Sequence, residues 1–307
     1  MQLPRQVREA IDRQAEAVPF GVLQRAASAL SDAYRAGEPP PRLEAAQRTA
    51  AYLVTRMPAT FAAARAVLEE VRRLLGGREI SSVLDVGAGA GAASLAALEE
   101  YPRAALTLMD RDGALLEASR QWLPQARRLQ ETVERTPNLE VHDLVILAYS
   151  AGEMTDPPLV RAWRAARVAL ILIEPGTPRG FAVVRAARSE LLAAGARMLA
   201  PCPAEGSCPV IDPGWCHFAA RVERSSLHRR IKGASLGYED EKFSYVAMAR
   251  EPAEPAASRI VGRPRRHPGL IELPTCTPGG LATVRISKRE RDRFRAARQA
   301  EWGAPGI

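Results

Sequence analysis

Cysteine is scarce in this 307-residue chain, and no cysteine occurs before residue 200. The sequence also lacks a signal peptide and any apolar run of about 20 residues, so it predicts a cytosolic protein that does not enter a membrane. Thiols stay reduced in that compartment, which makes a disulfide framework the weaker interpretation of the four cysteines. Three of them fall within residues 201–217, and this clustering is typical of metal ligands.

The cysteines also lack the close pairs with which small zinc sites usually bind their ion. Five, seven and fifty-nine residues separate Cys202, Cys208, Cys216 and Cys276. These gaps suit a 4Fe–4S cluster better, because its four thiolates arrive from separated directions, but the spacing alone leaves zinc open. The prolines between the first three cysteines indicate a loop, which disfavours the alternative that these thiols are small buried hydrophobes.

Positive charge is concentrated near the C-terminus. Residues 259–298 hold eleven Lys or Arg against three acids, which accounts for the whole net charge of +8, and a smaller basic cluster occupies residues 221–232. Such density predicts a surface that contacts nucleic-acid phosphates; the alternative is a solvated helix face over residues 288–298. We expect RNA contacts chiefly from five arginines: Arg229, Arg230, Arg263, Arg265 and Arg266.

The apolar pattern divides the chain into three regions. Residues 1–77 show helical spacing and no strand signal, with a Pro-rich segment at 37–41 between two helical pairs. Residues 78–250 alternate short apolar runs with helical ones, which predicts a Rossmann-like α/β domain interrupted by the cysteine loop at 201–217. Residues 251–307 predict a basic, β-rich extension that supplies Cys276 and closes with a helix. The strands expected are 80–86, 104–109, 144–147, 168–173, 196–200, 218–222, 243–249, 259–262, 270–273 and 281–286.

A glycine-rich loop, Asp85-Val-Gly-Ala-Gly-Ala-Gly, follows the first predicted strand and opens a helix. Gly87, Gly89 and Gly91 allow a sharp turn and a close approach of the backbone to a ligand. The Gly-x-Gly-x-Gly spacing and Asp85 favour S-adenosylmethionine over a dinucleotide, because S-adenosylmethionine has no pyrophosphate and carries an ammonium group that needs an acidic or carbonyl partner.

Two further carboxylates lie where this cofactor would bind. Asp110 ends the next strand, at a position where a carboxylate can accept both hydroxyls of a ribose. Glu174 follows the strand predicted at 168–173, at the edge where open α/β sheets bind ligands; a simple strand-to-helix turn is its alternative. For the site as a whole, the alternative is a Rossmann-like scaffold that has kept its loop without the ligand.

Two catalytic signatures of known methyltransferases are missing. The segment around the strand predicted at 144–147 reads Asp143-Leu-Val-Ile-Leu-Ala-Tyr-Ser, without the Asn/Asp-Pro-Pro-Tyr motif that binds a target nitrogen and without the nucleophilic cysteine of pyrimidine-carbon methyltransferases. Tyr149 and Glu153 are the catalytic candidates, and packing beneath the cofactor is the alternative for Tyr149. Turnover therefore stays open.

Several blocks resemble one family in order and wording: Asp85-Val-Gly-Ala-Gly-Ala-Gly, Asp143-Leu-Val-Ile-Leu-Ala-Tyr-Ser, Ile173-Glu-Pro-Gly-Thr-Pro, the Cys-Pro pairs at 202 and 208, Trp215-Cys-His-Phe, and Glu239-Asp-Glu-Lys-Phe-Ser-Tyr. Over residues 45–290 the chain resembles the methyltransferase-like proteins of the mitochondrial small ribosomal subunit, the Rsm-type family, which also has bacterial members. The resemblance implies a class I S-adenosylmethionine-dependent methyltransferase core, a 4Fe–4S cluster on the four cysteines, and association with small-subunit ribosomal RNA during assembly.

We therefore expect a monomeric protein that binds S-adenosylmethionine and a 4Fe–4S cluster and docks on small-subunit ribosomal RNA as a methyltransferase. A non-enzymatic ribosome assembly factor on the same fold is the alternative. Residues 1–20 contain acids, unlike a mitochondrial transit peptide, so a bacterial cytoplasmic location is expected. A zinc-bearing methyltransferase of small molecules is a third interpretation, but it leaves the basic C-terminal region unexplained.

Overall fold

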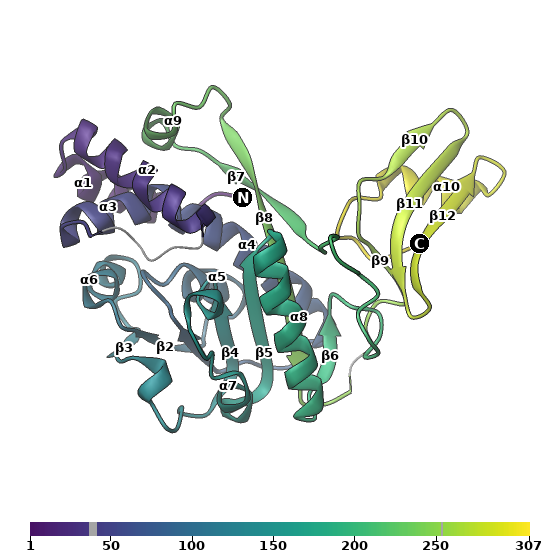
Figure 1. Cartoon of the computed structure of the whole chain (residues 1–307), viewed down its shortest axis with the longest axis horizontal. Coiled ribbons are helices and arrows are strands. Elements are labelled where there is room, and N and C mark those ends of the chain that lie inside the picture. The colour runs from purple at the N-terminus through teal and green to yellow at the C-terminus, as the bar shows by residue number, and fades with distance from the viewer. Residues whose placement is uncertain (37–41, 253) are drawn as a thin grey trace.

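The computed structural model describes residues 1–36, 42–252 and 254–307 and is shown in Figure 1. The Pro-rich segment at 37–41, predicted to separate two helical pairs, lies outside the described residues. The helices are α1 (Arg5–Glu16), α2 (Phe20–Ala36), α3 (Ala45–Thr55), α4 (Met57–Leu74), α5 (Ala92–Glu100), α6 (Gly113–Ala118), α7 (Leu159–Ala165), α8 (Pro178–Ala193), α9 (Ser226–Lys232) and α10 (Arg291–Gln299). The strands are β1 (Ser82–Val86), β2 (Ala105–Asp110), β3 (Arg127–Gln130), β4 (His142–Ala148), β5 (Ala166–Pro175), β6 (Arg197–Ala200), β7 (Phe218–Glu223), β8 (Tyr238–Ala249), β9 (Arg259–Ile260), β10 (Arg265–His267), β11 (Leu270–Thr277) and β12 (Gly280–Ser287).

Alternating side chains along the central strands build two buried faces of one large sheet. Leu144 and Ile146 of β4 belong to one apolar core, whereas Val145 and Leu147 belong to the other, because successive residues of a strand point to opposite faces. Helices α4 and α5 contribute to the first core, and α7 and α8 contribute to the second. The result is a three-layer α/β arrangement with the sheet in the middle (Figure 1).

The order of the strands identifies the fold class. The large sheet runs β3-β2-β1-β4-β5-β8-β6, and β7 pairs with β8. Neighbours from β3 to β5 are parallel, whereas β8 is antiparallel to β5, β6 and β7. A parallel half followed by one inserted antiparallel strand is the class I methyltransferase core that we expected. The carboxyl ends of β1, β2, β4 and β5 consequently share one edge of the sheet.

The sequence analysis did not predict strands β3 and β10, and the reason is the same for both. The edge strand β3 and the short β10 are both partly or fully exposed along their length, so neither carries the apolar run by which a strand is recognised. Strand β8 also begins five residues before the predicted strand at 243–249, because its first half forms a mostly solvent-facing hairpin with β7.

A second, smaller sheet follows the large one. Strands β10, β11 and β12 lie in that order, and β9 pairs with β11. Ile271, Leu273 and Ile286 form the core of this sheet beneath Phe294 and Ala297 of α10. The cysteine loop between β6 and β7 runs between α8 and this sheet (Figure 1). Among the helices that can be described, none is long and apolar enough to cross a membrane.

Candidate cofactor sites and basic surface

The glycine loop after β1 requires glycine at all three predicted positions. Gly87, Gly89 and Gly91 have φ values of +73°, +54° and +77°, a region that other residues enter only with strain. A Cβ atom on Gly87 would lie 2.3 Å from Cβ of Ser150, and one on Gly91 would lie 2.8 Å from Cδ1 of Leu123. The loop is therefore closely packed against the strand ends on either side.

Asp85 is buried at the start of this loop with one oxygen unsatisfied. Its Oδ2 accepts hydrogen bonds from the backbone N–H and the hydroxyl of Ser94, at 3.0 and 2.7 Å. Its Oδ1 is buried without a partner among the described residues. Burial raises the pKa of Asp85 to about 6. A ligand with a hydrogen-bond donor or a positive charge would satisfy the free oxygen.

Asp110 holds the glycine loop in place from the end of β2. Its Oδ2 accepts from the N–H of Gly89 at 2.7 Å, and its Oδ1 accepts from the N–H of Asp112 at 2.8 Å. Each carboxylate oxygen has two lone pairs, so Asp110 can accept ribose hydroxyls in addition to these bonds.

The glutamates at the ends of β4 and β5 complete an acidic ring around the loop. Glu174 is buried, accepts from the N–H of Gly152 at 3.0 Å, and has its pKa raised to about 7 by burial. Desolvation, with a contribution from Asp110, raises the pKa of Glu153. The site thus holds four carboxyls, counting Asp85 and Asp110, whose ionisation is costly, and it would gain stability from a cationic ligand.

Tyr149 adopts an unusual conformation at the end of β4. Its φ is +58°, and its hydroxyl donates to Oε1 of Glu241 in β8 at 2.9 Å. The guanidinium carbon of Arg56 lies 5.8 Å from the ring centroid. The hydroxyl is therefore engaged by β8 in this arrangement, and both a catalytic role for Tyr149 and its packing beneath the cofactor stay predictions.

Helix α3 covers the glycine loop, and the sequence analysis did not predict this contact. Arg48 pairs with Asp112 at 2.7 Å, and the hydroxyl of Tyr52 lies 2.9 Å from the position of a Cβ on Gly89. Four residues after Tyr52, the guanidinium group of Arg56 lies over the ring of Tyr149. A spacing of four residues places these three side chains on one face of a helix. That spacing is visible in the sequence and could have indicated a functional face.

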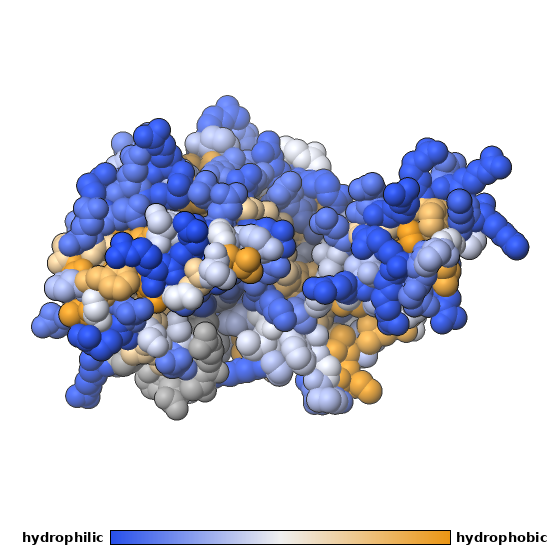
Figure 2. Space-filling model, turned by 90° about the horizontal axis from the view of Figure 1, so that it is seen from above, coloured by the Kyte–Doolittle hydropathy of each residue, from blue (hydrophilic) through white to orange (hydrophobic). Residues whose placement is uncertain are grey.

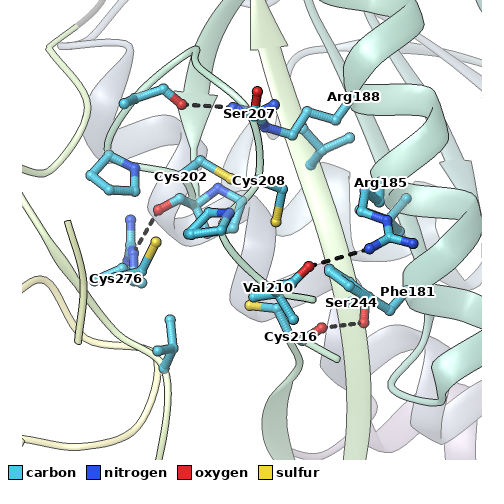
Figure 3. A pocket seen from close by; sticks show the side chains of 18 of the residues that line it. Phe181, Arg185, Arg188, Cys202, Ser207, Cys208, Val210, Cys216, Ser244 and Cys276 are labelled. Atoms are coloured by element: carbon cyan, nitrogen blue, oxygen red, sulfur yellow. Dashed lines mark hydrogen bonds between the residues drawn. The ribbon is translucent and has the colours of Figure 1, made fainter. Parts of the chain in front are cut away.

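The four predicted metal ligands converge on one cavity of about 140 Å³ (Figure 3). Cys202, Cys208 and Cys216 come from the loop, and Cys276 comes from β11 of the second sheet. Burial and the neighbouring thiols raise the pKa of Cys216, and the same causes raise that of Cys276 to about 11. Deprotonating these thiols therefore calls for a positive group in the cavity.

A single metal ion does not fit these thiols as they stand. Zinc binds sulfur at about 2.3 Å in a tetrahedron, which requires the ligands to surround one point. Within residues 1–36, 42–252 and 254–307, no three His, Cys, Asp or Glu side chains are close enough to hold one ion. The cysteines share a cavity without converging on one metal position.

Three arginines, Arg185, Arg188 and Arg259, also line this cavity, and Arg259 corrects our expectation of a basic surface. Arg259, counted with the RNA-contacting residues at 259–298, is only 1% exposed. It pairs with Glu70 of α4 at 3.0 Å and donates to the carbonyl of Pro201 at 3.0 Å. Arg259 therefore joins the helical region, the cysteine loop and the second sheet, and it does not contact RNA.

The remaining predicted RNA-binding arginines are exposed but do not form one stripe. Arg265 pairs loosely with Glu272 at 3.6 Å, whereas Arg266 donates to the carbonyl of Ala300 at 2.7 Å. Their side chains lie on opposite faces of β10, because they are consecutive in a strand. Arg229 and Arg230 lie on α9, where Arg230 stacks on Phe20 at 4.8 Å.

Arg221, at the start of the cluster at 221–232, lies near the second sheet. A hydrogen bond from Arg221, together with the charge of Arg263, lowers the pKa of Asp240 in β8. Arg229 and Arg230 are farther from that sheet, because α9 packs against α2 and α3 (Figure 1). Figure 2 shows the molecule from above, with hydrophilic side chains over much of this face.

Comparison with known proteins identifies related chains. The family described as mitochondrial small ribosomal subunit Rsm22 matches residues 46–305. The human mitochondrial ribosome assembly protein METTL17 is 25% identical over 284 residues, which cover 82% of this chain and 61% of METTL17. The chain thus spans about three fifths of the length of that relative.

Similar solved structures include two methyltransferases. One is precorrin-6y C5,15-methyltransferase from Geobacter metallireducens, with a TM-score of 0.39 and 16% identity over 60% of this chain and 86% of the other. The other is the plantazolicin methyltransferase BpumL in complex with SAH, with a TM-score of 0.39 and 10% identity over 80% of this chain and 99% of the other.

Proposed function

Because the chain belongs to the Rsm22 family of the mitochondrial small ribosomal subunit, we propose that it is a ribosome assembly factor on a methyltransferase fold. In this proposal it binds S-adenosylmethionine at the glycine loop, carries a 4Fe–4S cluster on its four cysteines, and docks on small-subunit ribosomal RNA as a monomer. Its relative METTL17 is itself named a ribosome assembly protein, which supports the assembly role.

The convergence of the four cysteines on one cavity is the observation that carries the proposal. Cysteines up to seventy-four positions apart in the sequence, on a loop and on a separate sheet, line the same 140 Å³ space. Apolar packing does not explain this arrangement, because other small hydrophobic residues could fill the same space as buried cysteines. A shared ligand is the simpler explanation.

An iron–sulfur cluster suits this donor set better than zinc. The four iron atoms of the cluster each bind one thiolate, so the sulfurs need not surround a single ion. The buried Nε of Arg188, which has no partner among the described residues, also fits an anionic group beside it. Bound there, the cluster would supply a one-electron redox couple and a link between the two sheets.

The acidic ring supports S-adenosylmethionine as the second ligand. This cofactor carries a sulfonium and an ammonium group, and both would favour the ionised forms of Asp85 and Glu174. The free Oδ1 of Asp85 offers an acceptor for the ammonium group. Asp110 can bind the ribose at the end of β2, as in other open α/β sheets.

Iron and sulfide analysis of anaerobically purified protein tests the cluster, and crosslinking to ribosomal RNA tests the partner. We expect about four irons and four sulfides per chain, with a visible absorbance that the Cys202→Ser variant lacks. Stoichiometric zinc without iron would contradict the cluster. Crosslinks that avoid small-subunit RNA would contradict the assembly role.

Methyl transfer to the RNA is a second candidate function, favoured by Glu174. A carboxyl with a pKa of about 7 at the carboxyl end of β5 can accept a proton near neutral pH. Transfer of labelled methyl groups from S-adenosylmethionine to immature small subunits tests this activity. Methyl transfer that the Glu174→Gln variant no longer performs would support an enzymatic function. Binding of S-adenosylmethionine without methyl transfer would support the non-enzymatic assembly factor.

A further inference from the structure

The guanidinium of Arg188 is buried without a counter-ion in the part of the chain that the structure describes. Arg188 lies on α8 and is 6% exposed. Its Nη2 donates to the carbonyls of Ala204 and Gly206, at 2.8 and 2.6 Å, and its Nε has no partner. Burying a charge without an opposite charge is strongly unfavourable. A fold that keeps this cation therefore needs an anion beside it.

The other arginines that line the cavity are compensated. Arg259 pairs with the carboxylate of Glu70. Arg185, one turn before Arg188 on α8, pairs with Asp212 at 3.6 Å, and its side chain is 35% exposed. Figure 3 shows Arg185 and Arg188 extending from the same helix beside the cysteines. Arg188 differs from Arg185 because it is buried, and from Arg259 because no carboxylate of the described residues pairs with it.

The groups nearest to Arg188 indicate what the anion is. Its side chain interacts with that of Cys202, and the carbonyls that it binds belong to the segment between Cys202 and Cys208. Four thiolates outweigh the positive charge of an iron–sulfur core, so the ligated cluster is an anion. The uncompensated cation and the anionic cluster would thus occupy one cavity.

We propose that Arg188 is the internal counter-ion of the 4Fe–4S cluster, and that its charge sets the reduction potential of the cluster while its Nη2 fixes the loop between Cys202 and Cys208. This inference rests on the proposed function, because it takes the cluster as bound. Reduction adds negative charge to the cluster, and a nearby cation stabilises the reduced form more than the oxidised form. Arg188 therefore acts as a positioning and tuning residue, without binding iron.

Potentiometric titration of the iron-loaded full chain tests the charge. We expect Arg188→Met to shift the reduction potential to a more negative value, and Arg188→Lys, which keeps the charge, to stay close to the unmodified chain. Arg185→Met is the matched control, because Arg185 is half-exposed and paired, and it should leave the potential unchanged. An unchanged potential in Arg188→Met at equal iron content would overturn the proposal.

The chelator-stripped protein provides a second measurement that needs no cluster. Without its anion, the buried charge of Arg188 costs more stability than its two hydrogen bonds to the loop contribute. Stripped Arg188→Met should therefore unfold at the same temperature as the stripped unmodified chain or at a higher one. A midpoint lower by more than about 2 °C would show that Arg188 merely anchors the loop, and would overturn the proposal even if the variant loses its iron. Absence of iron from the unmodified chain is a separate result, which contradicts the proposed function itself.

Discussion

The phenolic oxygen of Tyr52 lies 2.9 Å from the position that a Cβ atom on Gly89 would occupy. Tyr52 belongs to α3 and Gly89 to the loop after β1, so a helix of the N-terminal region closes over the centre of the cofactor loop. Gly89 has a φ of +54° as well. Glycine is required there for two separable reasons, the backbone conformation and the contact with Tyr52.

Double substitution separates these two reasons. We expect Gly89→Ala to cost about 1–2 kcal/mol from the left-handed backbone, with an added cost from Tyr52. Gly77 is the matched control, because its φ is +85° and nothing lies within 4 Å of its Cβ position. Tyr52→Phe should recover part of the loss in Gly89→Ala and none in Gly77→Ala, as measured by urea unfolding. Equal recovery in both backgrounds would argue against the contact.

Arg56 should recognise the amino-acid end of the cofactor. It lies over Tyr149 at the end of β4, whereas Arg48 lies eight residues earlier beside Asp112, about 12 Å away along the helix. SAH has an amino-acid carboxylate and methylthioadenosine has none. We expect Arg56→Met to weaken SAH binding about tenfold or more and to leave methylthioadenosine binding unchanged in calorimetry. Arg48→Met should weaken the binding of both ligands equally. Equal losses of affinity for SAH and methylthioadenosine in Arg56→Met would contradict the role of Arg56 at the amino-acid end.

Binding of S-adenosylmethionine should strengthen as pH rises. Burial raises the pKa of Asp85 to about 6 and that of Glu174 to about 7. Each carboxyl stabilises the ligand-free fold while protonated, and this stability is lost as pH rises through the two values. A cationic ligand favours the ionised forms, so affinity increases over the same interval.

Calorimetry at about pH 5.5 and pH 7.5 measures this change. Glu174→Gln should flatten the dependence, because its side chain cannot ionise. Glu140→Gln is the control, since Glu140 is exposed and pairs with Arg127 away from the loop. Affinity of the unmodified chain that does not change with pH would contradict the role of the acidic ring.

Loss of Cys276 should loosen the second sheet from the large one. Cys276 is the ligand supplied by β11, and a cluster on all four cysteines would close a long chain segment. We expect iron-loaded protein to resist limited proteolysis near residues 250–258 and the Cys276→Ser variant to be cut there faster. Thr277→Ser, a change at the adjacent residue, is the control. Equal cleavage rates in loaded wild type and Cys276→Ser would mean that the cysteine provides no link.

Affinity for ribosomal RNA should fall steeply with salt through the surface arginines of the second sheet. Each lost phosphate contact lowers the log–log slope by roughly 0.7 to 0.9. Arg263→Gln with Arg265→Gln should reduce both affinity and slope, whereas Arg13→Gln with Arg25→Gln in the N-terminal helices should change neither. Arg266 is left out because it donates to Ala300 within the chain. Equal losses of RNA affinity in the two double variants would indicate that the basic region contributes to solubility and does not bind RNA specifically.

The sequence by itself determined the local elements and the ligand-bearing segments. The buried runs of β1, β4 and β5 and the turn residues around Gly87 could be recognised without a fold, because periodicity and backbone freedom are properties of neighbouring residues. The clustering of Cys202, Cys208 and Cys216 was visible for the same reason. Strand β3 was not predicted, because an exposed edge strand has no apolar run.

Only the tertiary structure decided which distant residues share a site. It brought Cys276 from a separate sheet to the cysteine loop and laid α3 across the glycine loop. It also turned Arg259, one basic residue among many in the sequence, into a buried partner of Glu70, and left Arg188 buried without a counter-ion in the described part of the chain. Charge and chemistry can be read from residue types, whereas burial and pairing depend on which segments the fold packs together.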